Sequence, residues 1–396
     1  MNLENNPYYR KFRVFAWIPI IWLIRLLRPF FCVRFGGLFS ERIGHFAIET
    51  ELYLCQKALG KIPPRTIDLF FHRKAVPDAS ISNMTLLQMF KKRMFIHNIY
   101  ELLWKANHCA GGDGSAHFVD VPKAGSVEQG LLLDSTECQV EFSDQQVREG
   151  EDFLQGVGIG NSPFVCVHSR DSAYLNSAFP GINWDYHNYR DCDINSFVPA
   201  MEALTDKGYF VLRMGAVVGD SFQSANPRII DYSTLYRSDF LDIFLSSRCS
   251  FFLGTDSGLF NVAMLFRKKT IVTNYSQVNN VIYMPSFVTV LPKKIWSYER
   301  GCCLKYSEVL QRKIGNFVRT DEFEELKLTT ICNSPEDIVD VALEVAESCE
   351  RSEGESNFDP SIQNQFWSLY EDYDAQYKLY PRISSNFVIK NHELFE

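Results

Sequence analysis

The chain has 396 residues, of which 46% are hydrophobic and 22% are charged, so it is long enough for two domains and is not a disordered chain. Its formal net charge of −8 argues against nucleic acid as its main partner, because phosphate backbones favour basic surfaces. A small phosphate-bearing ligand remains compatible with this charge, because it needs only a local positive site.

The eleven cysteines show no C-x-x-C spacing, and Cys302 and Cys303 are adjacent. This pattern is neither a zinc framework nor a disulfide ladder, so it predicts reduced thiols and a cytoplasmic protein. The N-terminal stretch lacks the signal-peptide order of charge, apolar core and small-residue cleavage site, which favours the same location.

Residues 1–32 predict a membrane-proximal amphipathic segment, "KFRVFAWIPIIWLIRLLRPFF". Its uncharged run, 14–24, is shorter than the roughly 20 residues that a spanning helix needs. Basic residues flank the run and two tryptophans lie within it (Lys11, Arg13, Arg25, Arg28, Trp17 and Trp22). This composition is typical of a helix lying on an anionic leaflet, on the inner face of the cytoplasmic membrane. A helix that caps the core of the first domain is the alternative.

Residues 33–155 predict a first Rossmann-like domain. Strands are expected at 32–38 and 66–72, and helices at 46–59 and 83–94, from the periodicity of their apolar residues. The segment 149–161, which contains "GVGIGN", is expected to be a linker or hinge.

Residues 156–350 predict a second Rossmann-like domain with a regular alternation of elements. We expect strands at 163–170, 209–215, 250–255 and 269–274, and helices at 194–208, 241–249, 258–266 and 334–349. Near-continuous apolar strands alternating with helices indicate a parallel sheet buried on both faces. The fold class is therefore α/β, with two domains facing a cleft. Residues 351–396 are expected to form a helical tail that packs back on the N-terminal domain.

The tetrad Thr255, Asp256, Ser257 and Gly258 lies between an expected strand and an expected helix. Ligands of open α/β sheets bind at the carboxyl ends of strands, and a helix start offers free N–H groups to phosphate. Gly258 permits close backbone approach, and Ser257 adds a hydroxyl donor. Asp256 would cap the helix or accept a hydrogen bond from a sugar or ribose hydroxyl. A simple N-cap and turn is the alternative.

A second strand end, "VHSRD", carries His168, Ser169 and Arg170. Arginine presents a rigid fork of donors suited to a diphosphate, and Asp171 could hold that fork in place. The loop that follows adds His187, Asn188 and Arg190. Two strand ends with anion-binding chemistry in one sheet favour a phosphate site over an isolated salt bridge.

The pair Asp191 and Asp193 in "DCD" is similar to the Asp-x-Asp clamp of metal-dependent sugar transferases. That clamp normally follows an apolar strand, whereas this pair precedes a helix, where Asp193 is a good N-cap. We therefore predict no metal and no cofactor.

In the first domain, Glu41, Arg42 and His45 lie on a glycine-bounded loop after the first strand. The imidazole of His45 suits proton transfer near neutrality, and we expect it to face the phosphate site. Glu41, Glu49 and Glu51 are rival bases.

These segments resemble a known family. "IDYSTLYRSDFLDIFLSSRCSFFLGTDSGLFNVAMLFRKKTIVTN" resembles the donor half of GT-B glycosyltransferases, especially heptosyltransferase-like enzymes. "RIGHFAIETELYL" and "VHSRDSAYL" are similar to a family of bacterial glycosyltransferases, and "HSR" is similar to the His-x-Arg strand end of fucosyltransferases. The resemblance implies an acceptor-side first domain and a second domain that binds a nucleotide sugar.

By position, the resemblance implies a donor-binding set (His168, Arg170, Arg190, Thr255, Asp256, Ser257 and Gly258) and a catalytic set (His45, Glu41 and Arg170). His45 falls where heptosyltransferases place a catalytic Asp, and Asn261 stands where their motif has a His.

The expected activity is metal-independent, inverting transfer of a sugar from a nucleotide-sugar donor to a cell-surface glycan or lipid-linked acceptor, as in lipopolysaccharide or capsule synthesis. The alternatives are a nucleotide-sugar epimerase on the same fold and a non-catalytic scaffold for glycan assembly.

Overall fold

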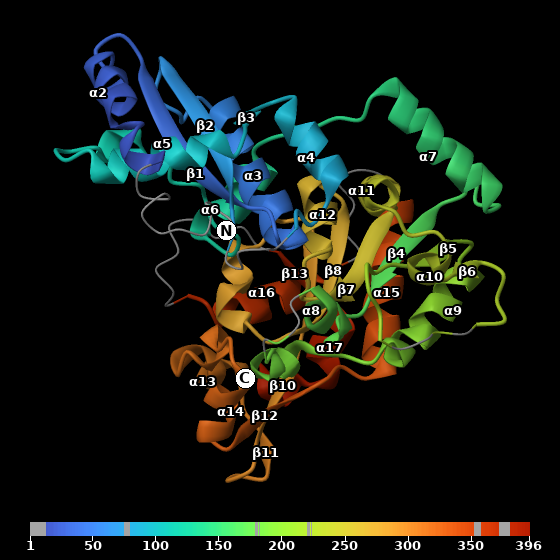
Figure 1. Ribbon diagram of the computed structural model, residues 1–396. Helices are drawn as coiled ribbons and strands as arrows, with labels where there is room; N and C mark the ends of the chain where they lie inside the picture. Colours follow the sequence, from blue (N-terminus) through green and yellow to red (C-terminus); the bar gives the residue numbers. More distant parts are fainter. Residues whose placement is uncertain are drawn as a thin grey trace. The chain divides into compact units, whose positions relative to one another are not determined.

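The computed structural model in Figure 1 describes residues 13–74, 80–178, 181, 183–219, 222, 224–351, 358–371 and 381–396. Internal contacts divide the chain into two compact units. Unit 1 comprises Met1–Ala124 and Cys138–Glu141, and unit 2 comprises Gly125–Glu137 and Phe142–Glu396.

Unit 1 is built on a small parallel sheet of order β1-β2-β3. Its elements are α2 (Ile18–Leu26), β1 (Cys32–Phe39), α3 (Ile43–Ala58), β2 (Thr66–Arg73), α4 (Met84–Lys91), β3 (Phe95–Ile96), α5 (Ile99–Cys109) and the 3₁₀ turn η2 (Ser115–His117). β1 and β2 pair along their whole length, from Cys32 opposite Thr66 to Phe39 opposite Arg73. Asn83 caps α4 by accepting a hydrogen bond from the N–H of Leu86, at 2.9 Å.

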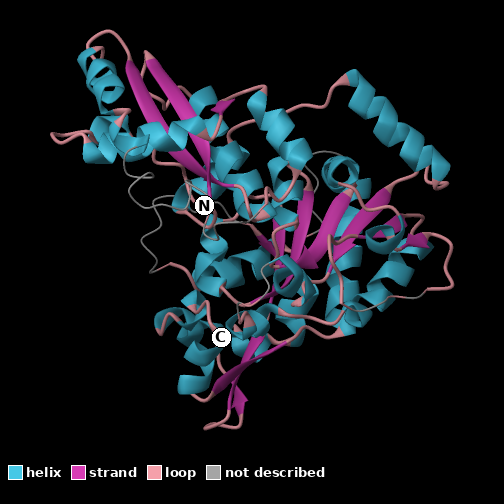
Figure 2. Cartoon of the chain, viewed as in Figure 1, coloured by secondary structure: helices cyan, strands magenta, loops and turns pink. Residues whose placement is uncertain are grey.

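Unit 2 is built on a seven-stranded parallel sheet of order β13-β9-β8-β7-β4-β5-β6, with helices around it (Figure 2). Its strands are β4 (Phe164–His168), β5 (Phe210–Arg213), β6 (Ile229–Ile230), β7 (Phe251–Thr255), β8 (Lys269–Tyr275), β9 (Val288–Pro292) and β13 (Arg382–Ile383). Every residue of β7 and β9 is buried, as the continuous apolar runs predict for a sheet covered on both faces.

The helices of unit 2 are α6 (Val127–Asp134), α7 (Asp144–Gly156), α8 (Ala173–Ala178), α9 (Val198–Asp206), α10 (Tyr232–Leu235), α11 (Asp239–Arg248), α12 (Phe260–Leu265), α13 (Tyr306–Gln311), α14 (Thr320–Glu325), α15 (Pro335–Glu350), α16 (Pro360–Ser368) and α17 (Ser385–Lys390). Its 3₁₀ turns are η3 (Asp185–Arg190), η4 (Ile194–Phe197), η5 (Val278–Tyr283), η6 (Ile314–Asn316) and η7 (His392–Leu394). A second, antiparallel sheet has the order β11-β10-β12, from β11 (Cys302–Cys303), β10 (Lys294–Ser297) and β12 (Leu328–Ile331).

The strand order of unit 2 reverses between β4 and β7. From β4 the chain proceeds to β5 and β6 on one side, and from β7 it proceeds to β8 and β9 on the other. Parallel sheets bind ligands outside the carboxyl ends of their strands at such a reversal. The expected α/β class with parallel sheets is confirmed. By this rule, the tips of β4 and β7 are the expected place for a ligand.

The expected boundary between the domains, near residue 155, is wrong. α7 begins in a capping box, in which Ser143 and Gln146 satisfy each other's backbone N–H groups, so the segment 149–161 is mostly helix and not a hinge. α7 also belongs to unit 2, because Gly150 leaves room for the ring of Phe244. A Cβ atom at Gly150 would lie 2.2 Å from that ring.

The described residues of the tail also belong to unit 2, and not to the N-terminal domain as expected. β13 extends the large sheet by pairing with β9, Arg382 opposite Thr289, and α17 packs against α15. The ring of Tyr370 is buried, and its hydroxyl donates a 2.7 Å hydrogen bond to the carbonyl of Val278.

α2 packs on unit 1 beside α5 and β1 (Figure 1). Ile21 is fully buried against Val33, Phe35, Leu103 and Ala106, so the core-capping alternative holds for one face of this helix. The guanidinium of Arg25 donates to the side chain and carbonyl of Asn107 and to the carbonyl of Gly111. Within the part of the chain that the structure describes, there is no helix with both the length and the apolarity needed to cross a membrane.

Candidate functional site

The tips of β4 and β7 lie side by side at the strand reversal of unit 2. They pair in parallel, with His168 opposite Gly254. Gly254 allows this close approach, since a Cβ atom there would lie 2.8 Å from the carbonyl oxygen of His168. The sequence therefore brings the two predicted strand ends to one place.

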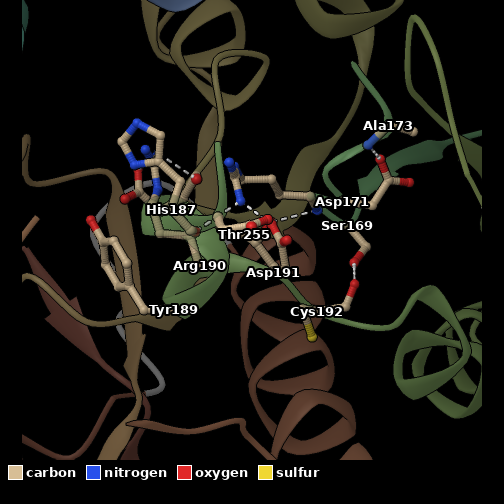
Figure 3. Close-up of polar contacts among 12 residues, drawn as sticks. Ser169, Asp171, Ala173, His187, Tyr189, Arg190, Asp191, Cys192 and Thr255 are labelled. Carbon is tan, nitrogen blue, oxygen red and sulfur yellow. Dashed lines mark hydrogen bonds and ion pairs between the residues drawn. The ribbon is translucent and has the colours of Figure 1, made fainter. Parts of the chain in front are cut away.

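Hydrogen bonds tie the segments that leave the two tips to each other. The N–H of Arg170 donates to Thr255 Oγ1 at 2.8 Å, a contact drawn in Figure 3, and Ser257 Oγ lies 3.1 Å from His168 Nδ1. Burial lowers the pKa of His168 to about 4, so the imidazole is neutral at physiological pH. The neutral imidazole of His168 and the hydroxyl of Ser257 are suited to form hydrogen bonds with a polar ligand, and neither group contributes a charge to the site.

Arg190, at the end of η3, holds the turn after β7. Its Nη2 donates to the carbonyl of Asp256 at 2.6 Å and lies 3.0 Å from Asp256 Oδ1. Burial is the largest single effect and opposes the charge of the guanidinium, but Asp256, Tyr189 and Tyr275 together outweigh it, so the pKa of Arg190 is raised. Two atoms of this pair, Arg190 Nε and Asp256 Oδ2, are buried without a hydrogen-bond partner among the described residues. A donor and an acceptor of this pair are thus enclosed by protein with their hydrogen-bonding capacity unsatisfied.

Arg170 is 8% exposed and forms an ion pair with Asp191 (Figure 3). Its Nη1 also donates to the carbonyl of His187 at 3.2 Å. Burial raises the pKa of Asp191, although the charge of Arg170 opposes the shift. Asp171, which the sequence suggested as the partner of Arg170, instead accepts hydrogen bonds from the N–H groups of Ala173 and Gly219.

The helix after the tetrad begins later than expected. α12 starts at Phe260, after Leu259 at the N-cap position, and no side chain caps it. Asp256 therefore does not cap this helix, because its carboxylate is engaged by Arg190. Thr255 ends β7, and Asp256, Ser257 and Gly258 lie in the bend and turn before α12, so the chemistry of the site comes from side chains and not from the N–H groups of a long helix.

A buried cation that the sequence reasoning missed contacts the η3 segment of this site. Lys293 is 2% exposed, and its Nζ donates to the carbonyl of Tyr189 at 2.6 Å. It directly follows the last residue of β9, Pro292, so the same strand-end criterion could have found it. Lys293 supports the η3 segment that carries Arg190, and its charge opposes the rise in the pKa of Asp191.

The Asp-x-Asp pair is divided between two local roles. Asp191 pairs with Arg170, and Asp193 caps η4 by accepting from the N–H of Asn195 at 2.8 Å. Across the described ranges, no group of three or more His, Cys, Asp or Glu side chains has the arrangement of a metal site.

In unit 1, His45 lies in the first turn of α3, and its Nδ1 is 2.8 Å from Glu49 Oε1. The imidazole is 46% exposed, whereas the carboxylate of Glu49 is 10% exposed and also accepts from the N–H of Ala124. A buried carboxylate that orients an exposed imidazole is an arrangement suited to proton transfer. Glu41 is buried in the turn between β1 and α3, and Glu51 is fully buried within α3 and accepts from the N–H of Gln139. The rival bases Glu41 and Glu51 are therefore less accessible than His45.

No protein-family model and no curated protein sequence matches the chain. Among solved structures, it is similar to the glycosyl transferase family 9 protein from Veillonella parvula DSM 2008, at 11% identity and a TM-score of 0.41, over 80% of this chain and 96% of that one. It is also similar to ADP-heptose lps heptosyltransferase II from E. coli, at 12% identity and a TM-score of 0.34, over 65% of this chain and 90% of that one.

A third similar structure is the heptosyltransferase TibC in complex with ADP-D-beta-D-heptose, at 11% identity and a TM-score of 0.33. That match covers 65% of this chain and 61% of TibC.

Proposed function

We propose that this chain is a glycosyltransferase that binds the diphosphate of a nucleotide-sugar donor between the tips of β4 and β7. The observation that carries the proposal is the Arg190–Asp256 pair, with its unpaired buried Nε and Oδ2 at the strand reversal. A nucleotide sugar has a hydrogen-bonding partner for each of these atoms, a phosphate oxygen for the guanidinium and a hydroxyl for the carboxylate. Arginine is the side chain best suited to bind such an oxygen with directed donors.

Charge at this site supports departure of a diphosphate. Arg190 lies close enough to Arg170 for its charge to contribute to the lowered pKa of Arg170, after the larger effect of burial. Two neighbouring guanidinium groups, that of Arg170 buried and that of Arg190 partly exposed, would stabilise negative charge that develops on a leaving diphosphate. In the structure, Asp191 and Asp256 balance these charges.

The proposed base is His45, oriented by Glu49. It would accept the proton of the acceptor hydroxyl as that oxygen attacks the anomeric carbon. The bond from that carbon to the diphosphate breaks, and the electron pair leaves with the nucleoside diphosphate. A single displacement of this kind inverts the anomeric carbon. The acceptor class, a surface glycan or lipid-linked sugar, belongs to this proposal through the sequence resemblance.

The eleven cysteines are all free in the structure, which supports a reducing compartment. We therefore include a cytoplasmic location in the proposal.

A thermal-shift screen with UDP-, GDP-, ADP- and CMP-sugars, ADP-heptose among them, tests the proposal, because a ligand that binds only the folded state raises the melting temperature. One nucleotide class should stabilise the wild-type chain and fail to stabilise Arg190→Ala. Arg300→Ala is the matched control, since Arg300 pairs with Glu308 on a different part of unit 2. Stabilisation by no nucleotide sugar would favour a non-catalytic scaffold, and release of a new sugar without acceptor would favour an epimerase.

A further inference from the structure

α2 has a second apolar face, which is exposed. Six large hydrophobic side chains on or next to this helix are 42–73% exposed: Phe15, Ile20, Trp22, Leu23, Leu26 and Phe30. The opposite face is the one that holds Ile21 in the core of unit 1. Exposed contiguous apolar surface of this kind marks an interaction site.

Basic residues gather at the edge of the unit 1 sheet at which its strands begin. Because β1, β2 and β3 are parallel, the segments that precede them gather at one edge. These segments are the end of α2, the loop 61–65 and the end of α4 with the loop 92–94. The N–H of Cys32 donates to the carbonyl of Arg65 at 2.9 Å, which joins the first two. The exposed cations near this edge are Arg28, Lys57, Lys61, Arg65, Lys91, Lys92 and Arg93.

A pocket of about 250 Å³ lies at this edge. Lys57, Lys91, Lys92 and Arg93 are among its lining residues. Its one carboxylate, Asp68, is already neutralised by Arg34, whose Nε lies 2.7 Å from Asp68 Oδ1. Exposed Phe95 and Ile67 are also among the lining residues, so the pocket combines uncompensated positive charge with apolar surface.

The charge of the whole unit agrees with this local pattern. Unit 1 carries 17 Lys and Arg against 10 Asp and Glu, a formal charge of +7, although the whole chain carries −8. The positive charge is therefore concentrated in the unit that exposes the apolar face of α2. A surface that combines basic residues with exposed tryptophan and leucine is complementary to anionic lipid headgroups and to the acyl region beneath them.

We propose that unit 1 docks on an anionic bilayer through the exposed face of α2, with the cations at the amino-terminal edge of its sheet contacting the headgroups. α2 has nine residues, so it lies along the interface and does not cross it. The candidate base His45 follows the carboxyl end of β1, at the opposite edge of the sheet, and is left accessible in this orientation. The proposal does not depend on sugar transfer, because docking needs only these surfaces.

Vesicle flotation of the full chain tests this orientation. Binding to vesicles containing 30% anionic lipid is expected to exceed binding to neutral vesicles by at least about tenfold and to fall with added salt. Leu23→Ser with Leu26→Ser, and separately Lys91→Glu with Lys92→Glu and Arg93→Glu, should each weaken binding by about tenfold or more. The controls, Leu235→Ser with Tyr298→Ser and Lys305→Glu with Lys313→Glu, replace exposed residues of unit 2 and should change binding less than about twofold.

Quenching of Trp22 fluorescence by brominated lipid provides a measurement on the otherwise unaltered surface, with Trp22→Phe as the reference. The proposal predicts that brominated lipid quenches part of the fluorescence of the wild-type chain and that this quenching is absent in Trp22→Phe. Equal binding of wild type and both sets of variants would overturn it. It would also be overturned if the leucine variant dissociated a dimer while vesicle binding stayed unchanged, because a second copy would then cover this face.

Discussion

The carboxylate and carbonyl of Asp256 are both held by the guanidinium of Arg190, at 3.0 Å and 2.6 Å. This pair joins the η3 turn to the turn after β7, although its members are 66 residues apart. It explains why an aspartate stands in a turn proposed to lie beside a phosphate: the carboxylate positions an arginine.

Replacement of Arg190 by alanine should cost both stability and donor affinity. The carboxylate of Asp256 would stay buried without its partner, a change that typically costs about 3–5 kcal/mol of unfolding free energy. Arg190→Ala with Asp256→Asn should recover part of that stability and none of the donor affinity. Denaturant unfolding and calorimetry measure the two effects separately. Recovery of both in the double variant would show that Arg190 acts only on the fold.

Gly254→Ala should destabilise unit 2 by about 1–3 kcal/mol, because the added methyl group would be forced against the carbonyl of His168. Gly156→Ala is the matched control, since its Cβ atom would meet nothing within 4 Å. Chemical denaturation of both variants gives the comparison. Equal stability of the two variants would mean that the tips of β4 and β7 are less closely packed than the structure shows.

Acid should weaken the fold through His168. Its pKa is lowered from 6.5 to about 4, so between these values the unfolded chain binds more protons and stability falls as pH falls. The contribution of this one group between pH 7 and pH 5 is roughly 2 kcal/mol. His168→Gln should therefore be less sensitive to pH than wild type over this interval, measured as free energies of unfolding. An unchanged slope would indicate that the imidazole is hydrated and not buried.

Cys332 should be the most reactive exposed thiol. A hydrogen bond from Cys192 lowers the pKa of Cys332 to about 6, helped by the charge of Lys293 against the opposing effect of burial. The thiolate, and not the thiol, reacts with iodoacetamide, so Cys332 should label at pH 7 before the exposed Cys109 and Cys302. Peptide mass spectrometry over time ranks the three sites. Cys192→Ser should slow the labelling of Cys332, and equal rates at all three sites would refute the proposed thiolate.

His45→Gln should lower kcat by about 10²–10⁴ with little change in donor affinity, because a general base acts on the chemical step. Glu49→Gln should have a smaller effect in the same direction, since it only orients the imidazole. Turnover with the donor identified by thermal shift measures both. Full turnover in His45→Gln would transfer the role of the base to another residue, with Glu41 the next candidate from the sequence.

Four strands of unit 2, β4, β5, β7 and β8, were predictable because each is a largely apolar run that ends in polar residues. The runs before Arg170 and Asp256 have this form, and the parallel pairing of β4 with β7 then follows from the fold class. Ser334 is the N-cap of α15, where its hydroxyl accepts a hydrogen bond from the N–H of Asp337. Local signals of this kind depend on a few neighbouring residues and can be found in a sequence.

The partners of the site residues were not predictable in this way. The loop that contains Asp191 and Arg190 folds into short 3₁₀ turns, which leave no apolar period, so the sequence did not show that Asp191 rather than Asp171 would hold Arg170. The prediction of a domain boundary near residue 155 differs from the structure for a similar reason. The cap at Ser143 and the contact of Gly150 with Phe244 decide it, whereas the glycines of "GVGIGN" suggested a hinge.

Calorimetric titration of the wild-type chain, Arg190→Ala and Arg300→Ala with UDP, ADP, GDP and CDP tests the central claim most directly. The account predicts that one nucleoside diphosphate binds wild type and Arg300→Ala alike, and binds Arg190→Ala at least about tenfold more weakly. Equal affinity for all three proteins, or no binding of any of the four nucleotides to the wild-type chain, would contradict a diphosphate site between β4 and β7.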